Sequence, residues 1–235
     1  MNRTPDSQAE NASSILVARS KDCCTDAGLG RSGHPTITLL AMTADGPEAR
    51  DASERDAEAC AEIYAPYLTD TAITFENEPP TSAEMAERIA AAQRGHAWLV
   101  LEDQGRVVGF AYGRPYKERH AYRWACEVSV YLERGRTRTG GGRALYDALL
   151  GRLAARGFRT AVAGMTLPND ASVGLHRAMG FHSVGTYRAI GWKGGTWHDV
   201  AWTQKAIGTD DDPPARGALS ASGQVRAQAR QQGPQ

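Results

Sequence analysis

The feature that most constrains the fold is a strand that runs into a glycine-rich turn and then into an amphipathic helix. Residues 127–132 (Glu-Val-Ser-Val-Tyr-Leu) have the β-branched and aromatic character of a strand, and residues 140–142 are three consecutive glycines. Apolar residues then recur at helical spacing: Leu145, Ala148, Leu149 and Leu153. Because glycines allow close backbone approach and the first N–H groups of a helix lack intrahelical partners, this segment predicts an anion-binding cradle.

Two common nucleotide-binding motifs do not fit this turn. Leu145 stands where G-x-G-x-x-G needs its last glycine, and the Gly-Lys-Ser/Thr sequence of a Walker motif is absent. Arg138 and Arg143 flank the glycines and add positive charge. The alternative is a glycine-rich helix entry without a ligand, because such turns are common.

The central region predicts an α+β fold, in which a mixed, mostly antiparallel sheet is flanked by helices. Helices are expected after Ser53 as N-cap, over residues 82–93, after the glycine turn and over residues 172–179. Strands are expected over residues 98–101, 107–112, 126–132, 160–165, 181–190 and 200–206.

Both ends of the chain lack the apolar residues that a core needs. We therefore expect residues 1–46 and 208–235 to be disordered around one domain at residues 47–207. Met42 stands just before that domain, so residues 1–41 are expected to be dispensable and are a candidate misplaced start. The alternative is a disordered extension with a regulatory or partner-binding role.

Charge and composition exclude several classes of partner. Lys plus Arg and Asp plus Glu each number 27, so no chain-wide field recruits nucleic acid or an anionic membrane. No apolar run approaches the roughly 20 residues that span a bilayer, and a signal peptide's apolar region is missing. The four cysteines lack C-x-x-C spacing. We expect a cytoplasmic protein that binds neither nucleic acid nor membrane.

The glycine turn resembles a known cofactor loop. Arg138-Thr139-Gly140-Gly141-Gly142-Arg143 before an amphipathic helix is similar to the pyrophosphate loop of GNAT acetyltransferases, usually written Gln/Arg-x-x-Gly-x-Gly/Ala, with Thr137 as a departure at the first position. Three other segments resemble the phosphinothricin N-acetyltransferase family within that superfamily: residues 121–124 before the strand at Glu127, residues 167–170 (Leu-Pro-Asn-Asp) and residues 197–200 (Trp-His-Asp-Val).

The resemblance spans about residues 48–207 and implies the GNAT acyltransferase fold. It implies acetyl-CoA as co-substrate and acetyl transfer to the α-amino group of a small amino acid such as phosphinothricin or methionine sulfoximine. It is also compatible with a homodimer. The alternatives are another acceptor amine, such as a polyamine or a protein N-terminus, and a non-catalytic acyl-CoA-binding sensor.

The resemblance also assigns roles to individual residues. It makes Glu127 the general base, acting directly or through water, where the alternative is a solvated glutamate at a strand edge. It implies that acetyl-CoA contacts Val130, Tyr131, Leu132, Arg138, Thr139, Gly140, Gly141, Gly142, Arg143 and Asn169. It places the acceptor against Phe75, Arg119, Tyr122 and His176.

Other readings of these residues stay open. Asn169 also suits an ordinary turn, His176 suits a structural helix histidine, and Lys117 suits a solvated loop. An acceptor with a second acid group needs guanidinium or phenol partners, which the basic and aromatic loop at residues 114–122 offers. His198 has no further ligands at metal-binding spacing, so no metal is expected.

Overall fold

The computed structural model describes residues 46–136 and 138–209, and its helices and strands lie between Glu48 and Ala206. The segments 1–46 and 208–235, for which we predicted disorder, lie outside the described residues except for residues 46, 208 and 209. The helices and strands of the described residues lie within the predicted domain at residues 47–207, whose boundaries stay a prediction.

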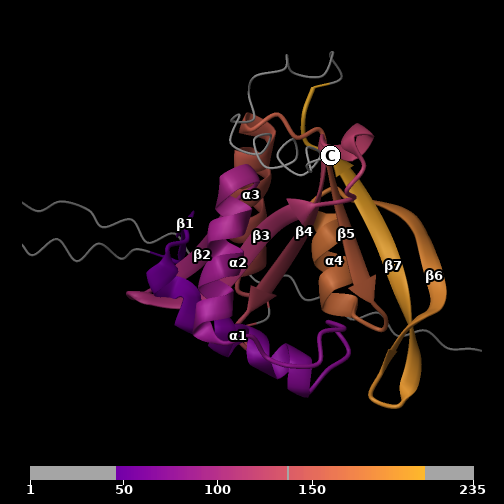
Figure 1. Ribbon diagram of the computed structural model, residues 1–235, viewed down its shortest axis with the longest axis horizontal. Helices are drawn as coiled ribbons and strands as arrows, with labels where there is room; N and C mark the ends of the chain where they lie inside the picture. Colours follow the sequence, from indigo (N-terminus) through magenta and orange to yellow (C-terminus); the bar gives the residue numbers. More distant parts are fainter. Residues whose placement is uncertain (1–45, 137, 210–235) are drawn as a thin grey trace, which may run out of the picture. The chain divides into compact units, whose positions relative to one another are not determined.

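Seven strands form one sheet in the order β1-β2-β3-β4-β5-β7-β6 (Figure 1). Their bounds are β1 Glu48–Asp51, β2 Trp98–Asp103, β3 Arg106–Pro115, β4 Ala125–Leu132, β5 Thr160–Thr166, β6 His182–Lys193 and β7 Thr196–Ala206. Neighbouring strands are antiparallel except for β4 and β5, which run parallel. The prediction of a mixed, mostly antiparallel sheet is confirmed.

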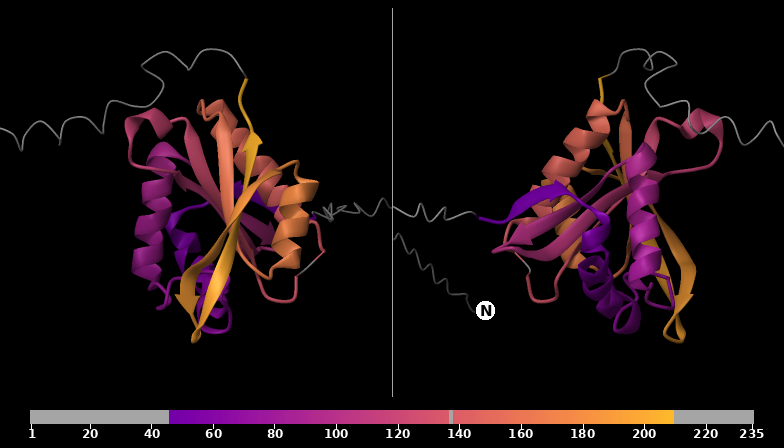
Figure 2. Two further views of the ribbon diagram at one scale, coloured as in Figure 1. Left: turned by 90° about the vertical axis from the view of Figure 1, so that its right-hand side faces the viewer. Right: turned by 60° about the vertical axis from the view of Figure 1, so that its left-hand side comes forward.

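Helices cover both faces of the sheet (Figures 1 and 2). On one face lie α1 (Ala57–Thr69) and α2 (Ser82–Gly95), and on the other lie α3 (Gly141–Ala155) and α4 (Asp170–Ala178). Two short 3-10 turns, Glu54–Asp56 and His120–Tyr122, complete the described elements. The α+β class is confirmed.

The start of α2 follows directly from the local sequence. Thr81 is its N-cap, and the Thr81 hydroxyl oxygen accepts a hydrogen bond from the Glu84 amide at 3.2 Å. The Glu84 carboxylate in turn accepts from the Thr81 amide at 2.8 Å, which completes a capping box. Ser53, predicted to cap α1, instead precedes the 3-10 turn Glu54–Asp56, from which α1 continues.

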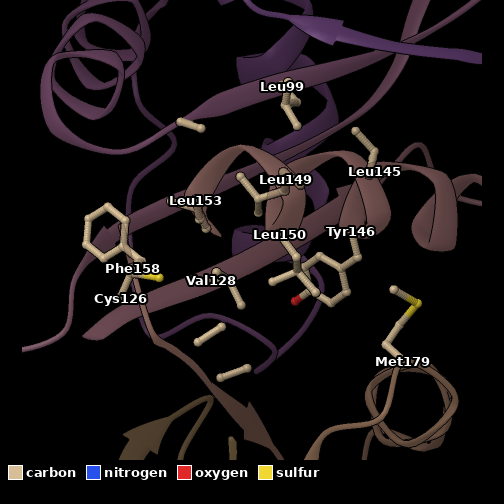
Figure 3. Packing of buried hydrophobic residues seen from close by; sticks show 14 of the residues in the cluster. Leu99, Cys126, Val128, Leu145, Tyr146, Leu149, Leu150, Leu153, Phe158 and Met179 are labelled. Atoms are coloured by element: carbon tan, nitrogen blue, oxygen red, sulfur yellow. The ribbon is translucent and has the colours of Figure 1, made fainter. Parts of the chain in front are cut away.

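Each face of the sheet has its own apolar core. Leu145, Leu149 and Leu153 of α3 pack with strand residues such as Leu99 and Val128, and all of these side chains are almost fully buried (Figure 3). Against α1 and α2 pack more aromatic side chains: Tyr64, Trp98 and Phe110, with Tyr112 and Tyr131 at the margin. The strands supply both cores because successive side chains point to opposite faces.

The β6–β7 hairpin is longer than predicted. Its strands continue through residues 182–193 and 196–206 to a turn at Gly194 and Gly195, whereas we predicted strands only over 181–190 and 200–206. Both turn glycines have positive φ, 59° and 78°, as a two-residue hairpin turn requires. The pair Gly194-Gly195 was the turn signal that the prediction did not use.

Candidate active site

The parallel strands β4 and β5 separate part-way along their length. Their pairing covers only Ala125↔Thr160, Cys126↔Ala161 and Glu127↔Val162, although β4 continues to Leu132. Figure 1 shows the two strands diverging toward their C-terminal ends. Among the described residues, the edge of β4 beyond Glu127 therefore has no strand partner on the β5 side.

The glycine turn ends at the N-terminus of α3. Gly140 is the N-cap residue with φ 83°, a conformation that favours glycine, and the first helical bond is donated by the Ala144 amide to the Gly140 carbonyl at 3.0 Å. A Cβ on Gly141 would lie 2.7 Å from Leu101 Cδ2. The N–H groups of residues 141–143 precede that first bond, so they can face an anion.

Two side chains of the turn contact the protein itself. Arg143 Nη2 donates to the Ala178 carbonyl oxygen at 3.3 Å, and Thr139 Oγ1 donates to the Arg136 carbonyl oxygen at 3.2 Å. Arg138 adopts a positive φ of 62°, and Thr137 lies outside the described residues. The anion-binding capacity of this turn therefore rests mainly on its backbone.

Asn169 begins α4 as its N-cap. Its side-chain oxygen accepts a hydrogen bond from the Ser172 amide at 3.1 Å. The side-chain amide group carries two further donors, which leaves the predicted contact with CoA compatible with the cap. Asn169 can therefore cap the helix at this turn and still contact CoA.

Glu127 lies where β4 and β5 stop pairing, and its side chain is 16% exposed. Arg114 of β3 is its cross-strand neighbour, and Arg114 Nη2 lies 2.6 Å from Glu127 Oε1. This ion pair holds the carboxylate in one place, so Glu127 is not the freely solvated strand-edge residue of the alternative. Sequence reasoning had Arg114 only as the first residue of the basic and aromatic loop at residues 114–122, and it did not predict the pairing with Glu127, which depends on the register of β3 and β4.

Several tyrosines belong to the α1 and α2 face, on which Glu127 also lies. Burial raises the pKa of Tyr64 to about 12, and it raises the pKa values of Tyr112 and Tyr131 as well. The Tyr64 hydroxyl contacts Thr74 Oγ1 at 2.9 Å, and the Tyr112 hydroxyl bonds to Ser129. At neutral pH these phenols stay protonated and offer uncharged hydrogen-bonding groups on this face of the sheet.

One backbone group predicted to bind acetyl-CoA is engaged inside the protein. Tyr67 of α1 donates from its hydroxyl to the Leu132 carbonyl oxygen at 2.6 Å. Val130 and Tyr131 lie on the same stretch of β4 as Leu132, which pairs with β3 but not with β5. The stretch is thus anchored at its C-terminal end by α1.

His176 is 3% exposed and bridges α4 to α3. Its Nδ1 lies 2.8 Å from the Ser172 carbonyl oxygen, which can only accept, so Nδ1 carries the hydrogen. Nε2 then accepts from the Tyr146 hydroxyl at 2.9 Å. Burial lowers the pKa of His176, partly offset by the Ser172 bond, so the ring is uncharged. These contacts favour the structural reading; a contact with the acceptor stays a prediction.

Phe75 lies in the loop between α1 and α2 and packs on the β6–β7 hairpin. Its ring occupies the space where a Cβ on Gly191 would lie, and its centroid is 6.3 Å from that of His198. Lys193 Nζ donates to the carbonyl oxygens of Thr74 and Glu76 at 2.7 and 2.9 Å, on either side of Phe75. The hairpin therefore fixes the loop that carries this predicted acceptor residue.

Arg119 and Tyr122 lie on the loop from β3 to β4, which leads directly to Glu127. Tyr122 is 43% exposed and meets Tyr116 edge to face at 5.7 Å, while Tyr116 also contacts Trp202 of β7 at 6.1 Å. Lys117 stacks over the ring of Tyr116 at 5.1 Å. The loop thus reaches from β3 across to β7, at the end of the sheet where Glu127 lies.

A cavity of about 540 Å³ lies between α2 and strands β2 and β3. Arg114 is one of its lining residues, so the ion pair with Glu127 stands at the cavity's rim. The volume is within the roughly 300–1,000 Å³ typical of small-molecule sites.

No group of three or more His, Cys, Asp or Glu residues within 46–136 and 138–209 is placed to hold a metal ion. Within the same ranges, no helix has the length and apolarity that crossing a bilayer requires.

Known proteins are similar to this chain in sequence and fold. The model of the acetyltransferase (GNAT) domain matches residues 50–202. The phosphinothricin N-acetyltransferase of Streptomyces viridochromogenes is 41% identical over 158 residues, which cover 67% of this chain and 86% of that protein. The chain belongs to the GNAT acetyltransferases and, among them, to the phosphinothricin N-acetyltransferase family.

Two other similar proteins are an acetyltransferase with named acceptors and a crystal structure with bound acetyl-CoA. An L-methionine sulfoximine/L-methionine sulfone acetyltransferase of Pseudomonas aeruginosa is 33% identical over 66% of this chain and 91% of its own length. A crystal structure of a phosphinothricin acetyltransferase from Sinorhizobium meliloti in complex with acetyl-CoA superimposes with a TM-score of 0.69 at 36% identity, covering 73% of this chain and 95% of that one. The present chain is therefore an acetyl-CoA-dependent N-acetyltransferase, and the family and fold that the sequence resembled are confirmed.

Proposed function

We propose that this acetyltransferase moves the acetyl group of acetyl-CoA to the α-amino group of a small amino acid such as phosphinothricin or methionine sulfoximine, with Glu127 as general base. The observation that carries the proposal is the position of Glu127, an ion-paired carboxylate at the point where β4 leaves β5. The relatives named for these two acceptors supply the substrate class.

The unpaired edge of β4 suits the pantetheine arm of acetyl-CoA. Backbone groups of Val130, Tyr131 and Leu132 would pair with the arm as another strand does, and one N–H would polarise the thioester carbonyl. The pyrophosphate would lie at the N-terminus of α3 against the N–H groups of residues 141–143, with Asn169 as a further contact.

Glu127 would take a proton from the amine as its nitrogen attacks the thioester carbon. The C–N bond forms and the C–S bond breaks, so that an ammonium acceptor loses two protons in total. One proton goes to the sulfur of the departing CoA, and the other leaves through Glu127 to solvent. Phe75, Arg119, Tyr122 and His176 remain the proposed acceptor contacts.

The purified chain should be assayed for thiol release from acetyl-CoA with phosphinothricin, methionine sulfoximine, spermidine and a short peptide. We expect rapid thiol release and an N-acetylated product with the two amino acids only. Preference for spermidine or the peptide would show that the acceptor assignment is wrong. Acetyl-CoA binding by calorimetry without turnover of any amine would instead favour the acyl-CoA sensor.

We include a homodimer and a cytoplasmic location in the proposal. Large apolar side chains stand exposed on the β6–β7 hairpin: Val184, Tyr187, Ile190, Trp192 and Trp197. The buried thiols of Cys60 and Cys126 are unpaired, which suits a reducing compartment. Light scattering tests the dimer: Ile190→Glu should shift the mass to that of one chain, and an unchanged monomeric mass in both forms would remove the dimer.

A further inference from the structure

The cavity between α2 and the sheet has an aromatic and aliphatic interior. Its lining includes Trp98, Phe110 and Tyr112 from β2 and β3, with Met85 and Ala92 from α2. The Trp98 ring stacks on Tyr112 at 4.5 Å and on Phe110 at 5.4 Å, so the three rings form a continuous wall. Such a surface binds an apolar group of substantial size rather than an ion.

The polar groups of the lining are already neutral or paired. Burial, assisted by the charge of Arg156, lowers the pKa of His96 to about 4, so its ring is uncharged at neutral pH. Glu76 forms an ion pair with Arg88 at 3.0 Å and accepts a hydrogen bond from the Tyr64 hydroxyl at 3.2 Å. The interior therefore offers no unpaired charge to an incoming group within the described lining.

The rim of the cavity carries charges of both signs close together. Arg114 lines the cavity, and its Nη2 lies 2.6 Å from the carboxylate of Glu127. The Arg114 side chain is 56% exposed, and a guanidinium has five N–H donors in a planar fork that matches a carboxylate. An α-amino acid carries an ammonium and a carboxylate on one carbon, which is the complement of this pair.

We propose that the cavity holds the side chain of the acceptor, so that this enzyme acetylates α-amino acids with large apolar or aromatic side chains, with Arg114 binding the α-carboxylate beside Glu127. This inference rests on the proposed transfer of acetyl to an α-amino group, and it gives the acceptor a large apolar side chain in place of the anionic side chain of phosphinothricin. When the acceptor enters, the ion pair between Arg114 and Glu127 breaks. Arg114 then pairs with the carboxylate of the substrate, and Glu127 pairs with its ammonium group. The side chain then extends from the rim over the wall of Trp98, Phe110 and Tyr112.

A panel of acceptors tests the cavity. Steady-state kcat/KM should be measured for alanine, leucine, phenylalanine, tryptophan and phosphinothricin with saturating acetyl-CoA. Burial of an aromatic side chain contributes enough free energy for phenylalanine to exceed alanine by roughly 10–100-fold in kcat/KM. Equal values for alanine and phenylalanine would assign the cavity to another occupant and overturn the proposal.

A comparison of acids with amides tests Arg114. Phenylalaninamide keeps the side chain and the amine but lacks the carboxylate, so the native enzyme should prefer phenylalanine by roughly 10–100-fold. Arg114→Met should bring that ratio close to one, and Arg114→Lys should restore part of it. An acid-to-amide preference that persists in Arg114→Met would remove Arg114 from acceptor binding.

A bulky side chain at the mouth of the cavity is an independent test of the proposed occupant. Ala91 lies at the exposed mouth of the cavity, so Ala91→Trp should lower the phenylalanine-to-alanine ratio toward one by occupying the entrance. Ala83→Trp, at an exposed position on the first turn of the same helix and outside the lining, is the matched control and should keep the native ratio. An unchanged ratio in Ala91→Trp contradicts the proposal.

The two levels of inference fail in different ways. Acetylation of phosphinothricin without preference for apolar side chains leaves the proposed function standing and overturns the cavity assignment. Absence of turnover with every amino acid overturns the proposed function. Calorimetry with phenylalanine and the CoA-loaded protein then tests the cavity assignment separately from turnover. Phenylalanine binding that depends on Arg114 would still support the assignment of the cavity to the acceptor side chain.

Discussion

The two faces of the sheet differ in what their buried side chains do. The α3 face is mainly aliphatic, with Leu99, Leu145 and Leu149 fully buried, and it also buries the ring of Tyr146, whose hydroxyl bonds to His176 (Figure 3 shows the packing of Tyr146 and the leucines). The α1 and α2 face buries tyrosines with bonded hydroxyls, encloses a cavity of about 540 Å³ and carries the Arg114–Glu127 pair. The α1 and α2 face thus carries the residue proposed as general base, whereas the α3 face carries most of the aliphatic core and the helix N-terminus proposed for the pyrophosphate.

A single strand serves both faces by alternation. Along β4, Cys126 and Val128 pack toward α3, whereas Glu127 and Tyr131 belong to the face of α1 and α2. Neighbouring residues therefore have separate tasks, and a substitution can affect one property without the other.

The largest effect is expected at Glu127. Glu127→Gln should lower kcat at neutral pH by roughly 10²–10⁴-fold, because an amide cannot accept the proton of the amine. Calorimetry should show nearly native acetyl-CoA affinity, and Glu118→Gln, an exposed carboxylate of the neighbouring loop, is the control. An unchanged kcat would take Glu127 out of the mechanism and weaken the contrast between the faces.

Leu149→Ala should act on stability instead. Leu149 is fully buried against the sheet, so removing three carbons leaves a void and should cost about 2–5 kcal/mol in the free energy of unfolding. Urea unfolding measures the loss, while kcat per folded molecule should stay native. Val173→Ala, at a residue of α4 that is 38% exposed, should change stability by at most about 0.5 kcal/mol. A large fall in kcat for Leu149→Ala would show that the faces are coupled.

The pH dependence of stability should report His96, at the edge of the cavity. Its pKa is lowered to about 4, so the unfolded chain binds the proton first as the pH falls below 6.5. The contribution to stability is complete above pH 6.5 and is lost toward pH 4. Comparing urea unfolding of the native chain and His96→Gln should show a difference in this loss of about 1–3 kcal/mol. If the free energy of unfolding depends on pH in the same way for both proteins, His96 is not the source of this loss of stability.

A substitution in the glycine turn should affect acetyl-CoA alone. Gly142→Val should raise the KM for acetyl-CoA by roughly tenfold or more, because the side chain hinders backbone approach to the pyrophosphate. A Cβ there lies 3.0 Å from Leu175 Cδ2, whereas one on Gly151 of the same helix has nothing within 4 Å. Gly151→Val is therefore the control, and equal acetyl-CoA KM values would show that the turn does not bind the cofactor.

The smallest effect is expected from deleting residues 1–41. The melting temperature and kcat/KM should stay within error of the full chain, since the contacts described above are made by residues from 48 onward. Deleting residues 1–52 is the contrasting control, because it removes β1 and the Arg50 bonds to Asp56 and Glu102 at 2.8 and 2.7 Å. A fall of several degrees for the shorter deletion would contradict the predicted domain boundary.

Local patterns predicted most of the elements but not their lateral order. Residues 82–95 form a helix because a capping box starts it, and residues 141–155 form one because glycines precede a periodic apolar run. The position of β7 between β5 and β6 was not predictable in this way, since pairing depends on residues far apart in the sequence. The same holds for Phe75 against Gly191 and for Arg114 against Glu127.

The sequence by itself determined the glycine turn, the strand bearing Glu127 and the family to which both belong, because these depend on residues close together in the chain. Tertiary structure alone decided where β4 parts from β5, that Arg114 restrains Glu127, and that His176 is neutral and buried against Tyr146. Burial and charge pairing depend on which segments meet in space. That is set by the packing of two helical layers on one sheet and not by any local pattern.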